Sequence, residues 1–316
     1  MPNPNEKKAG KATKVTAITL GDPQGIGPEV IAKSIAAYSP SGSLVIVGAR
    51  RYFPGCSLRV IREVGQVRPG EIAFLEVEDD PAGADPSFVW VKTAAGMALR
   101  REVRALVTAP VSKNKWLESG LPFRGHTDFF ATVASGAAGP PAMFFWSPGL
   151  KVALFSHHIP LREVFPCLDR EKITAFVRLV DAELRRLFAQ DFTFLFSGLN
   201  PHAGENGHLG NEEIDVIIPA IIDLQKQVPV AGIYPPDVVF AKARTMKSAV
   251  VVAWTHDQGL IPFKLLHSTD GVQLTLGLPF VRTSPVHGTA YDIAGKGIAD
   301  PASMLAAIRL AESLPY

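Results

Sequence analysis

The chain has 316 residues, 47% of them hydrophobic and 20% charged, which is the composition of a globular protein with one large or two ordinary domains. Its formal net charge of +2 argues against a nucleic-acid-binding surface, and no apolar run has the length of a membrane span. Two cysteines without a CxxC pair suit a reducing compartment, so we expect a cytoplasmic protein without nucleic-acid or membrane partners. The polar residues 1–14 lack a signal-peptide core and are predicted to form a disordered arm.

The first predicted strand, VTAITL at residues 15–20, leads into a glycine-rich turn and then a helix. This turn either serves only to connect strand and helix, or it places backbone amides against a ligand such as a cofactor. Its spacing is not that of the GxGxxG dinucleotide fingerprint. Residues 43–48, SLVIVG, predict a second buried strand and therefore a parallel sheet. The candidates for cofactor contact in the turn are Gly21, Gly25 and Gly27.

Further along the chain, residues 93–102 are predicted to be helical, and residues 103–110 are predicted to form a strand followed by a turn. The segment FRGHTDFFA places His126 and Thr127 just before a predicted helix. Thr127 either caps that helix, or it joins His126 in holding an anion at the positive helix start. Near the C-terminus, Asp300 is expected to cap a last helix that begins at Pro301.

Three predicted strands each end close to a histidine. KVALFS ends in the pair His157-His158, FTFLFSG is followed by His202, and the run VVVAW is followed by His256. Parallel strands bring their carboxyl ends to one edge of a sheet, so the three imidazoles are expected to converge. Three histidines with an open position are typical of a catalytic divalent metal, zinc first. Taken singly, each histidine is more often an ordinary polar residue, and position alone does not choose between His157 and His158.

Other charged groups accompany these histidines. Asp257 follows His256 in what we predict to be a polar loop, and Asp237 lies in a second predicted loop, residues 232–240. Lys264 and Arg282 suit a phosphate or a carboxylate, although either is equally well explained as a solvated surface charge.

Several blocks of this sequence together resemble the 4-hydroxythreonine-4-phosphate dehydrogenases, the PdxA family of pyridoxal phosphate biosynthesis, from about residue 15 to residue 316. The resemblance implies a two-domain α/β/α fold similar to isopropylmalate and isocitrate dehydrogenases, with mostly parallel sheets and the active site in the interdomain cleft. Residues 15–118 and 280–316 would form the first domain. Residues 119–279 would form the second, with the metal histidines and the dimer interface. The blocks are GDPQGIGPEV, TAPVSK, GHTDFFA, SHHIPL, GLNPHAGENG, HDQGLIPFK and TLGLPFVRTSPVHGTAYDIAGKG.

The resemblance also implies roles for individual residues. The metal ligands would be His158, His202 and His256, and the substrate contacts would be His126, Thr127, Lys264, Arg282 and Gln273, where the family has Asn. Asp257 and Asp237 are candidates for orienting a metal histidine or for proton transfer, and Lys264 is a further catalytic candidate. The implied cofactors are NAD or NADP and a divalent metal, with Zn²⁺ expected before Mg²⁺ or Co²⁺. The implied assembly is a homodimer whose active sites are shared between subunits.

The implied reaction is oxidation of the C3 hydroxyl of 4-phosphooxy-L-threonine, followed by decarboxylation to 3-amino-2-oxopropyl phosphate in pyridoxal 5'-phosphate biosynthesis. The chain departs from the family at Gln273, at Thr255, where Tyr is usual, and in a short segment between Gly96 and Thr108. These departures leave open other substrates, namely D-threonate or D-erythronate 4-phosphate or an aromatic cis-dihydrodiol. They also leave open a catalytically silent metal- or phosphate-binding relative. The retained GHT block, residues 125–127, favours a phosphorylated substrate.

Overall fold

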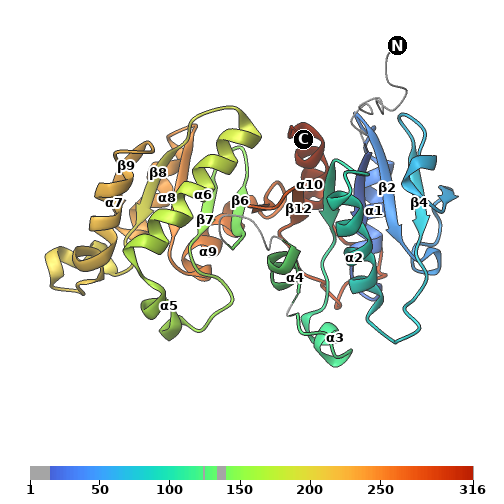
Figure 1. Ribbon diagram of the computed structural model, residues 1–316, viewed down its shortest axis with the longest axis horizontal. Coiled ribbons are helices and arrows are strands. Elements are labelled where there is room, and N and C mark those ends of the chain that lie inside the picture. The colour runs from blue at the N-terminus through green and yellow to red at the C-terminus, as the bar shows by residue number, and fades with distance from the viewer. Residues whose placement is uncertain (1–14, 124, 134–139, 316) are drawn as a thin grey trace, which may run out of the picture.

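The computed structural model describes residues 15–123, 125–133 and 140–315, so the predicted arm at residues 1–14 lies outside the described residues. Figure 1 shows two lobes side by side. One lobe contains the first strands together with the C-terminal helix, and the other contains the middle of the chain. No helix within the described ranges is long and apolar enough to cross a membrane.

A single twelve-stranded sheet runs through both lobes in the order β3-β4-β2-β1-β5-β12-β11-β6-β7-β10-β8-β9. The strands pair in parallel, except that β11 is antiparallel to β12 and β6, and β6 is antiparallel to β7. The first lobe holds β1 (Val15–Thr19), β2 (Ser43–Gly48), β3 (Arg59–Ile61), β4 (Ile72–Glu76), β5 (Ala105–Thr108) and β12 (Val281–Pro285). The second lobe holds β6 (Ala142–Trp146), β7 (Lys151–Leu154), β8 (Thr193–Ser197), β9 (Val230–Tyr234), β10 (Ala249–Ala253) and β11 (Val272–Leu276).

The strand sequences explain why the sheet is buried on both faces. The central strands β1, β2, β5, β7 and β10 are rich in β-branched residues and buried along their whole length, as parallel strands covered by helices require. The covering helices are α1 (Gly27–Ala36), α2 (Pro86–Leu99), α6 (Arg170–Phe188), α7 (Ile218–Leu224), α8 (Pro236–Arg244), α9 (His256–His267) and α10 (Ala302–Ser313). Three shorter helices are α3 (Lys113–Glu118), α4 (His126–Val133) and α5 (Leu161–Cys167). The mixed α/β architecture with a mostly parallel sheet is therefore as predicted.

The sheet does not break between the two lobes, because β11 and β12 pair directly. The predicted division into two domains stays a prediction. The strand predictions at residues 15–20, 43–48, 103–110 and 151–156 are confirmed. Asp169 caps α6 by accepting a hydrogen bond from the Lys172 amide at 2.9 Å.

Four local predictions need correction. Helix α2 begins at Pro86, well before the predicted residue 93, because the Asp85 side chain caps it there. The predicted loop at residues 232–240 is the end of β9 and the start of α8. The predicted loop after β10 is the first turn of α9, since Thr255 Oγ1 accepts a hydrogen bond from the Gln258 amide as a helix cap. The last helix begins at Ala302, with its amide hydrogen-bonded to Asp300 at 2.9 Å.

Candidate active site

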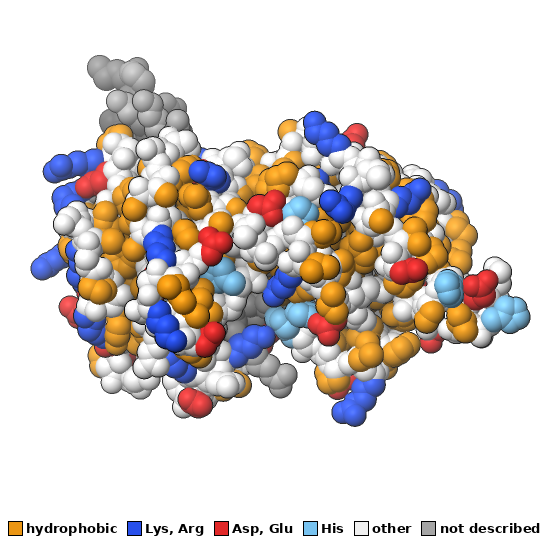
Figure 2. All heavy atoms as spheres, turned by 180° about the vertical axis from the view of Figure 1, so that it is seen from behind, with side chains coloured by type: hydrophobic (Ala, Val, Ile, Leu, Met, Phe, Trp, Pro, Cys, Tyr) orange, Lys and Arg blue, Asp and Glu red, His pale blue; other side chains and the backbone are white. Residues whose placement is uncertain are grey.

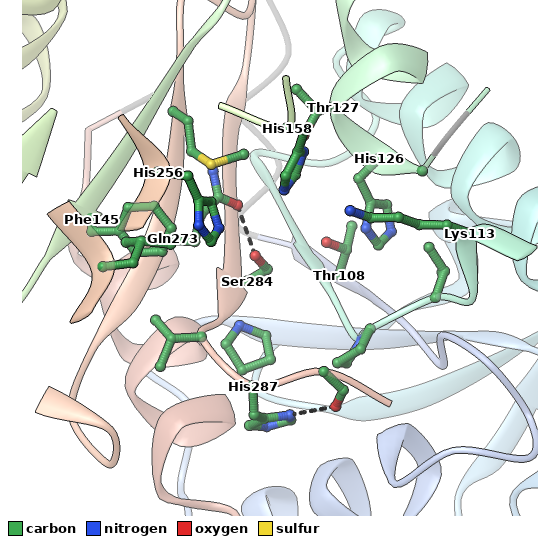
Figure 3. A pocket seen from close by; sticks show the side chains of 18 of the residues that line it. Thr108, Lys113, His126, Thr127, Phe145, His158, His256, Gln273, Ser284 and His287 are labelled. Atoms are coloured by element: carbon green, nitrogen blue, oxygen red, sulfur yellow. Dashed lines mark hydrogen bonds between the residues drawn. The ribbon is translucent and has the colours of Figure 1, made fainter. Parts of the chain in front are cut away.

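A cleft of about 300 Å³ opens where the two lobes meet, and both lobes contribute to its walls. The first lobe supplies the segment after β5, the second supplies the ends of β7 and β10, and α4, β11 and β12 close it. Figure 3 shows the side chains that point into this cleft, and Figure 2 shows histidine, lysine and arginine side chains gathered around the hollow between the lobes. The cleft therefore lies beyond the carboxyl ends of parallel strands, where α/β sheets bind ligands.

His158 and His256 lie together in the cleft, with ring centroids 5.5 Å apart. They come from adjacent parallel strands, β7 and β10. His256 Nδ1 is 2.7 Å from Asp257 Oδ1, so Nε2 is the nitrogen left to face a ligand. Desolvation, assisted by the nearby charge of Lys113, lowers the pKa of His158 to about 4. The imidazole is thereby kept neutral, the form that binds metals.

His157 faces a different cavity, beside Phe155 and Phe176, and its Nδ1 is buried without a partner among the described residues. This placement agrees with the choice of His158 over His157 as the candidate ligand. The positive φ of His158, 54°, belongs to the turn after β7 that directs successive side chains to the two cavities.

His202 does not join the other two histidines, which corrects the expectation that all three converge within one chain. Strand β8 does lie beside β10, but His202 is exposed on the following turn, Pro201–Gly207, and does not line the cleft. Among the described residues no group of three His, Cys, Asp or Glu side chains is arranged to hold a metal ion. One chain thus brings together two of the three predicted ligands.

The turn that carries His202 has an unusual backbone. Six consecutive residues, four of them not glycine, have positive φ angles between 44° and 91°. L-residues pay roughly 1–2 kcal/mol each for the left-handed conformation, so surrounding contacts must hold it. The fully buried Glu213 anchors the two residues that lead into this turn: its carboxylate accepts hydrogen bonds from the amides of Leu199 and Asn200, both at 2.8 Å, and from the Asn200 side chain at 2.9 Å.

The charge on the cleft walls is positive. Arg282, 3% exposed, lies 5.3 Å from the centre of the Phe130 ring, and burial without a carboxylate partner lowers its pKa to about 9. Lys113 and Lys264 also line the cleft, and partial desolvation lowers the pKa of Lys264, although the residue is exposed. None of the described lining residues is Asp or Glu. The cleft therefore suits an anionic ligand.

His126 and Thr127 line the same cleft. Helix α4 begins at His126, so Thr127 lies in its first turn and not at the capping position. The His126 ring stacks on Phe130 with an interplanar angle of 14°, and its buried Nε2 has no partner among the described residues. Burial, followed by the charge of Arg282, lowers the pKa of His126 well below its usual value. A buried polar atom without a partner is suited to a ligand contact.

The other predicted site residues lie outside the cleft. Asp257 is exposed and touches the site only through His256. Asp237 is exposed in the first turn of α8, which packs against the turn that carries His202. Two of the candidate glycines have a packing reason: a Cβ on Gly21 would lie 2.4 Å from the Pro110 carbonyl oxygen, and one on Gly27 2.2 Å from the Leu20 carbonyl oxygen.

Four polar residues of the cleft, Thr108, Lys113, Ser284 and His287, were given no role in our predictions. Thr108 is the last residue of β5, Lys113 lies five residues beyond it, and His287 lies two residues beyond the end of β12, so their place at a strand end was the available signal. Thr283, next to Ser284, faces away and hydrogen-bonds the Ala307 carbonyl at 2.9 Å. The alternation of side chains along β12 separates these two neighbours.

Comparison with known proteins agrees with this geometry. The family described as "Pyridoxal phosphate biosynthetic protein PdxA" matches residues 57–311. The chain is 38% identical to a 4-hydroxythreonine-4-phosphate dehydrogenase from Sulfurihydrogenibium sp., over 93% of this chain and 96% of that protein. It is 39% identical to a D-threonate 4-phosphate dehydrogenase from Salmonella typhimurium, over 96% of this chain and 99% of that protein.

A crystal structure of a 4-hydroxythreonine-4-phosphate dehydrogenase from Klebsiella pneumoniae superposes with a TM-score of 0.80 at 37% sequence identity, covering 94% of this chain and 98% of that one. The family match extends over most of the chain, and both the sequence and the structural similarities extend over nearly all of it. The chain therefore belongs to the PdxA family.

Proposed function

We propose that this protein is a metal- and NAD(P)-dependent dehydrogenase that oxidises the C3 hydroxyl of a four-carbon, 4-phosphorylated hydroxy acid and releases C1 as carbon dioxide. The observation that carries the proposal is the pair His158 and His256 inside a cationic cleft whose described walls hold no carboxylate. The family membership supports it, because relatives are named as dehydrogenases of 4-hydroxythreonine 4-phosphate and of D-threonate 4-phosphate.

The cations of the cleft are the natural contacts for the two anionic ends of such a substrate. Arg282 and Lys264 hold the phosphate in this proposal, with the hydroxyl of Thr127 and the free Nε2 of His126 as further contacts. The pKa of His126 lies well below its usual value, so the ring is neutral at neutral pH. Its Nε2 then either accepts a hydrogen bond from a donor on the ligand or, in the other tautomer, donates one to the ligand.

Two imidazoles side by side fit a divalent metal but fall one ligand short of a three-histidine site. We infer that His202 of the partner subunit completes it in a homodimer. Its exposure on a rigidly held turn supports this assignment. So does the apolar surface just after the turn, where Leu209, Ile214, Ile218 and Ile222 are 36–50% exposed. Asp237 of the partner subunit would approach the same site.

Oxidation removes a hydride from C3 and a proton from its hydroxyl, and the β-keto acid then loses carbon dioxide, leaving an electron pair that takes a proton at C2. A bound metal would lower the pKa of the hydroxyl and polarise the ketone, and the nicotinamide would accept the hydride. Of the predicted acid–base groups only Lys264 lines the cleft, and its lowered pKa favours proton exchange there. Asp257 orients His256 by fixing its tautomer.

A second cavity, of about 530 Å³, is our candidate for the dinucleotide. It is lined by Gly25 from the turn before α1 and by Gly295 and Gly297 near the C-terminus. The same C-terminal segment lines the substrate cleft through His287 and Gly288, so one stretch of chain borders both cavities. The Ile26 amide is hydrogen-bonded to the carbonyl of Thr289 in this stretch at 2.9 Å, which ties the glycine turn to it.

The lining also favours one substrate over another. 4-Phosphooxy-L-threonine carries an ammonium at C2, whereas D-threonate 4-phosphate carries a hydroxyl. An ammonium enclosed among lysine, arginine and histidine side chains, with no described carboxylate on the walls, would lose water without gaining a counter-charge. D-threonate 4-phosphate is therefore the substrate that the lining favours. We expect its kcat/KM to exceed that of 4-phosphooxy-L-threonine by at least about tenfold.

The test is a panel of substrates with reduced-cofactor formation as the readout: 4-phosphooxy-L-threonine, D-threonate 4-phosphate, D-erythronate 4-phosphate and an aromatic cis-dihydrodiol. We expect turnover of phosphorylated acids and none of the diol. Turnover of the diol alone would refute the proposal. Absence of turnover with retained metal would identify a catalytically silent relative.

The shared site is tested by complementation between two inactive variants, His202→Ala and His256→Ala. If one copy supplies His202 and the other supplies His158 and His256, a mixed dimer contains one intact site. Refolding an equal mixture should then restore about a quarter of wild-type activity. If all three ligands came from one chain, the mixture would stay as inactive as each variant alone.

A further inference from the structure

Arg282 is a buried cation with an unusual set of partners. It is 3% exposed, and no ion pair to it occurs in the described part of the chain. Its hydrogen bonds all go to neutral oxygens. Nη1 donates to Gln273 Oε1 and, at 3.0 Å, to Thr275 Oγ1. Nε and Nη2 donate to Thr108 Oγ1 at 3.1 and 2.5 Å. A buried guanidinium without a counter-charge needs a ligand to neutralise it.

The donors of the guanidinium can be counted. It carries five N–H groups, and the four contacts above use the one on Nε, both on Nη1 and one on Nη2. One N–H on Nη2 is left without a partner among the described residues. Arg282 lines the cleft, so this remaining donor and the whole positive charge are available to an anion there.

Gln273 has its oxygen fully engaged, while one of the two N–H groups on Nε2 has no partner among the described residues. It is 7% exposed, and its Oε1 accepts a second hydrogen bond, from Ser284 Oγ at 2.8 Å. Its Nε2 donates to Thr275 Oγ1 at 3.2 Å. Figure 3 shows the bond between Gln273 and Ser284 on the wall of the cleft. The oxygen of the amide that was predicted to contact substrate is thus committed to the protein and fixed toward Arg282.

We propose that Gln273 is a positioning residue that acts on Arg282 through its amide oxygen. Together with Thr108 and Thr275 it forms a neutral cradle, which fixes the guanidinium by hydrogen bonds yet leaves its charge uncompensated for the phosphate of the substrate. The choice of an amide is essential, since a carboxylate of the same shape would form an ion pair with Arg282 and cancel the charge that the ligand needs. This inference rests on the proposed function for the identity of the anion.

The test compares Gln273→Glu, which is nearly isosteric but charged, with Gln273→Met, which has a similar volume and no acceptor. Binding of inorganic phosphate is measured by titration calorimetry, and KM and kcat are measured with the phosphorylated substrate. We expect Q273E to weaken phosphate binding and raise KM by at least about tenfold, with kcat within about threefold of wild type. Q273M should weaken both by a smaller factor, because it loosens the guanidinium without neutralising it.

A double-mutant cycle separates positioning from direct contact. If Gln273 acts through Arg282, then Q273M added to Arg282→Ala should cause no further loss of phosphate binding. An additive loss, or phosphate binding by Q273E within twofold of wild type, would overturn the inference. If Q273E fails to fold, the cycle with Q273M still decides. A wild-type protein that binds phosphate but oxidises no phosphorylated acid would refute the proposed function while leaving the cradle testable.

Discussion

The buried carboxylate of Glu213 offers a sharp test of how this chain holds His202 in place. Glu213→Gln keeps the shape and the oxygen that accepts the Leu199 and Asn200 amides. It removes the charge, and it places an NH₂ group where the other oxygen accepts the Asn200 side-chain amide at 2.9 Å. Two charge-assisted hydrogen bonds become ordinary ones, and the third is replaced by a contact between two donors.

The size of the effect follows from these three bonds. Hydrogen bonds to charged groups contribute about 1.5–3 kcal/mol and neutral ones about 0.5–1.5 kcal/mol. Weakening two bonds and losing one in a fully buried site should therefore lower the free energy of unfolding by about 3 kcal/mol. Because the left-handed turn depends on this carboxylate, activity and metal content should also fall.

The assay is equilibrium urea unfolding followed by circular dichroism, together with turnover and metal content of the folded variant. Asp215→Asn is the matched control, because it removes one negative charge from an exposed position two residues away and should stay within about 0.5 kcal/mol of wild type. An E213Q variant as stable and as active as D215N would refute the reasoning that Glu213 holds the turn.

Three further predictions concern other parts of the site. The pKa of His126 is lowered by burial, so the stability that its neutral form contributes is present above the unfolded pKa of about 6.5 and is lost as pH falls below it. Between pH 7.5 and 5.5 the free energy of unfolding should therefore fall by about 1.4 kcal/mol more in wild type than in His126→Asn. Equal losses in the two proteins would contradict the burial argument. Asp257→Asn should weaken metal binding about 10- to 100-fold, because the carboxylate no longer orients His256, and calorimetry that finds wild-type affinity would exclude this role. Gly27→Ala should lower the free energy of unfolding by at least about 2 kcal/mol, since the new Cβ would lie 2.2 Å from a backbone oxygen. Gly65→Ala is the control, because a Cβ there would have nothing within 4 Å and should be tolerated. Similar urea midpoints for both variants would show that the backbone at residue 27 relaxes.

Much of the fold could be predicted from the sequence because its signals are local. Runs of β-branched residues such as those of β2 and β10 specify buried parallel strands. Asp169 marks the start of α6, because its side chain accepts a hydrogen bond from the amide of Lys172, only three residues further along the chain. Segments whose structure depends on contacts from elsewhere were predicted less well. The helical start at His256 was read as a loop because its polar residues suit either, and only the cap by Thr255 decides.

The sequence by itself determined which strands are followed by histidines: the pair His157-His158 after β7 and His256 after β10. Together with the family resemblance, it singled out His158, His256, Lys264 and Arg282, and all four line one cleft. The tertiary structure decided the distances and partners. A left-handed turn held by a buried carboxylate keeps His202 out of the cleft of its own chain.

The same distinction applies to Gln273, whose role depends on atoms that are distant in sequence. Whether its amide meets a ligand or the protein depends on Arg282 and Ser284, which lie on the neighbouring strand β12. Local patterns fix the strand, its direction and the face on which a side chain lies. The hydrogen bonds that set the charge of the site form only when two strands pair in one register, and that pairing is a property of the folded chain alone.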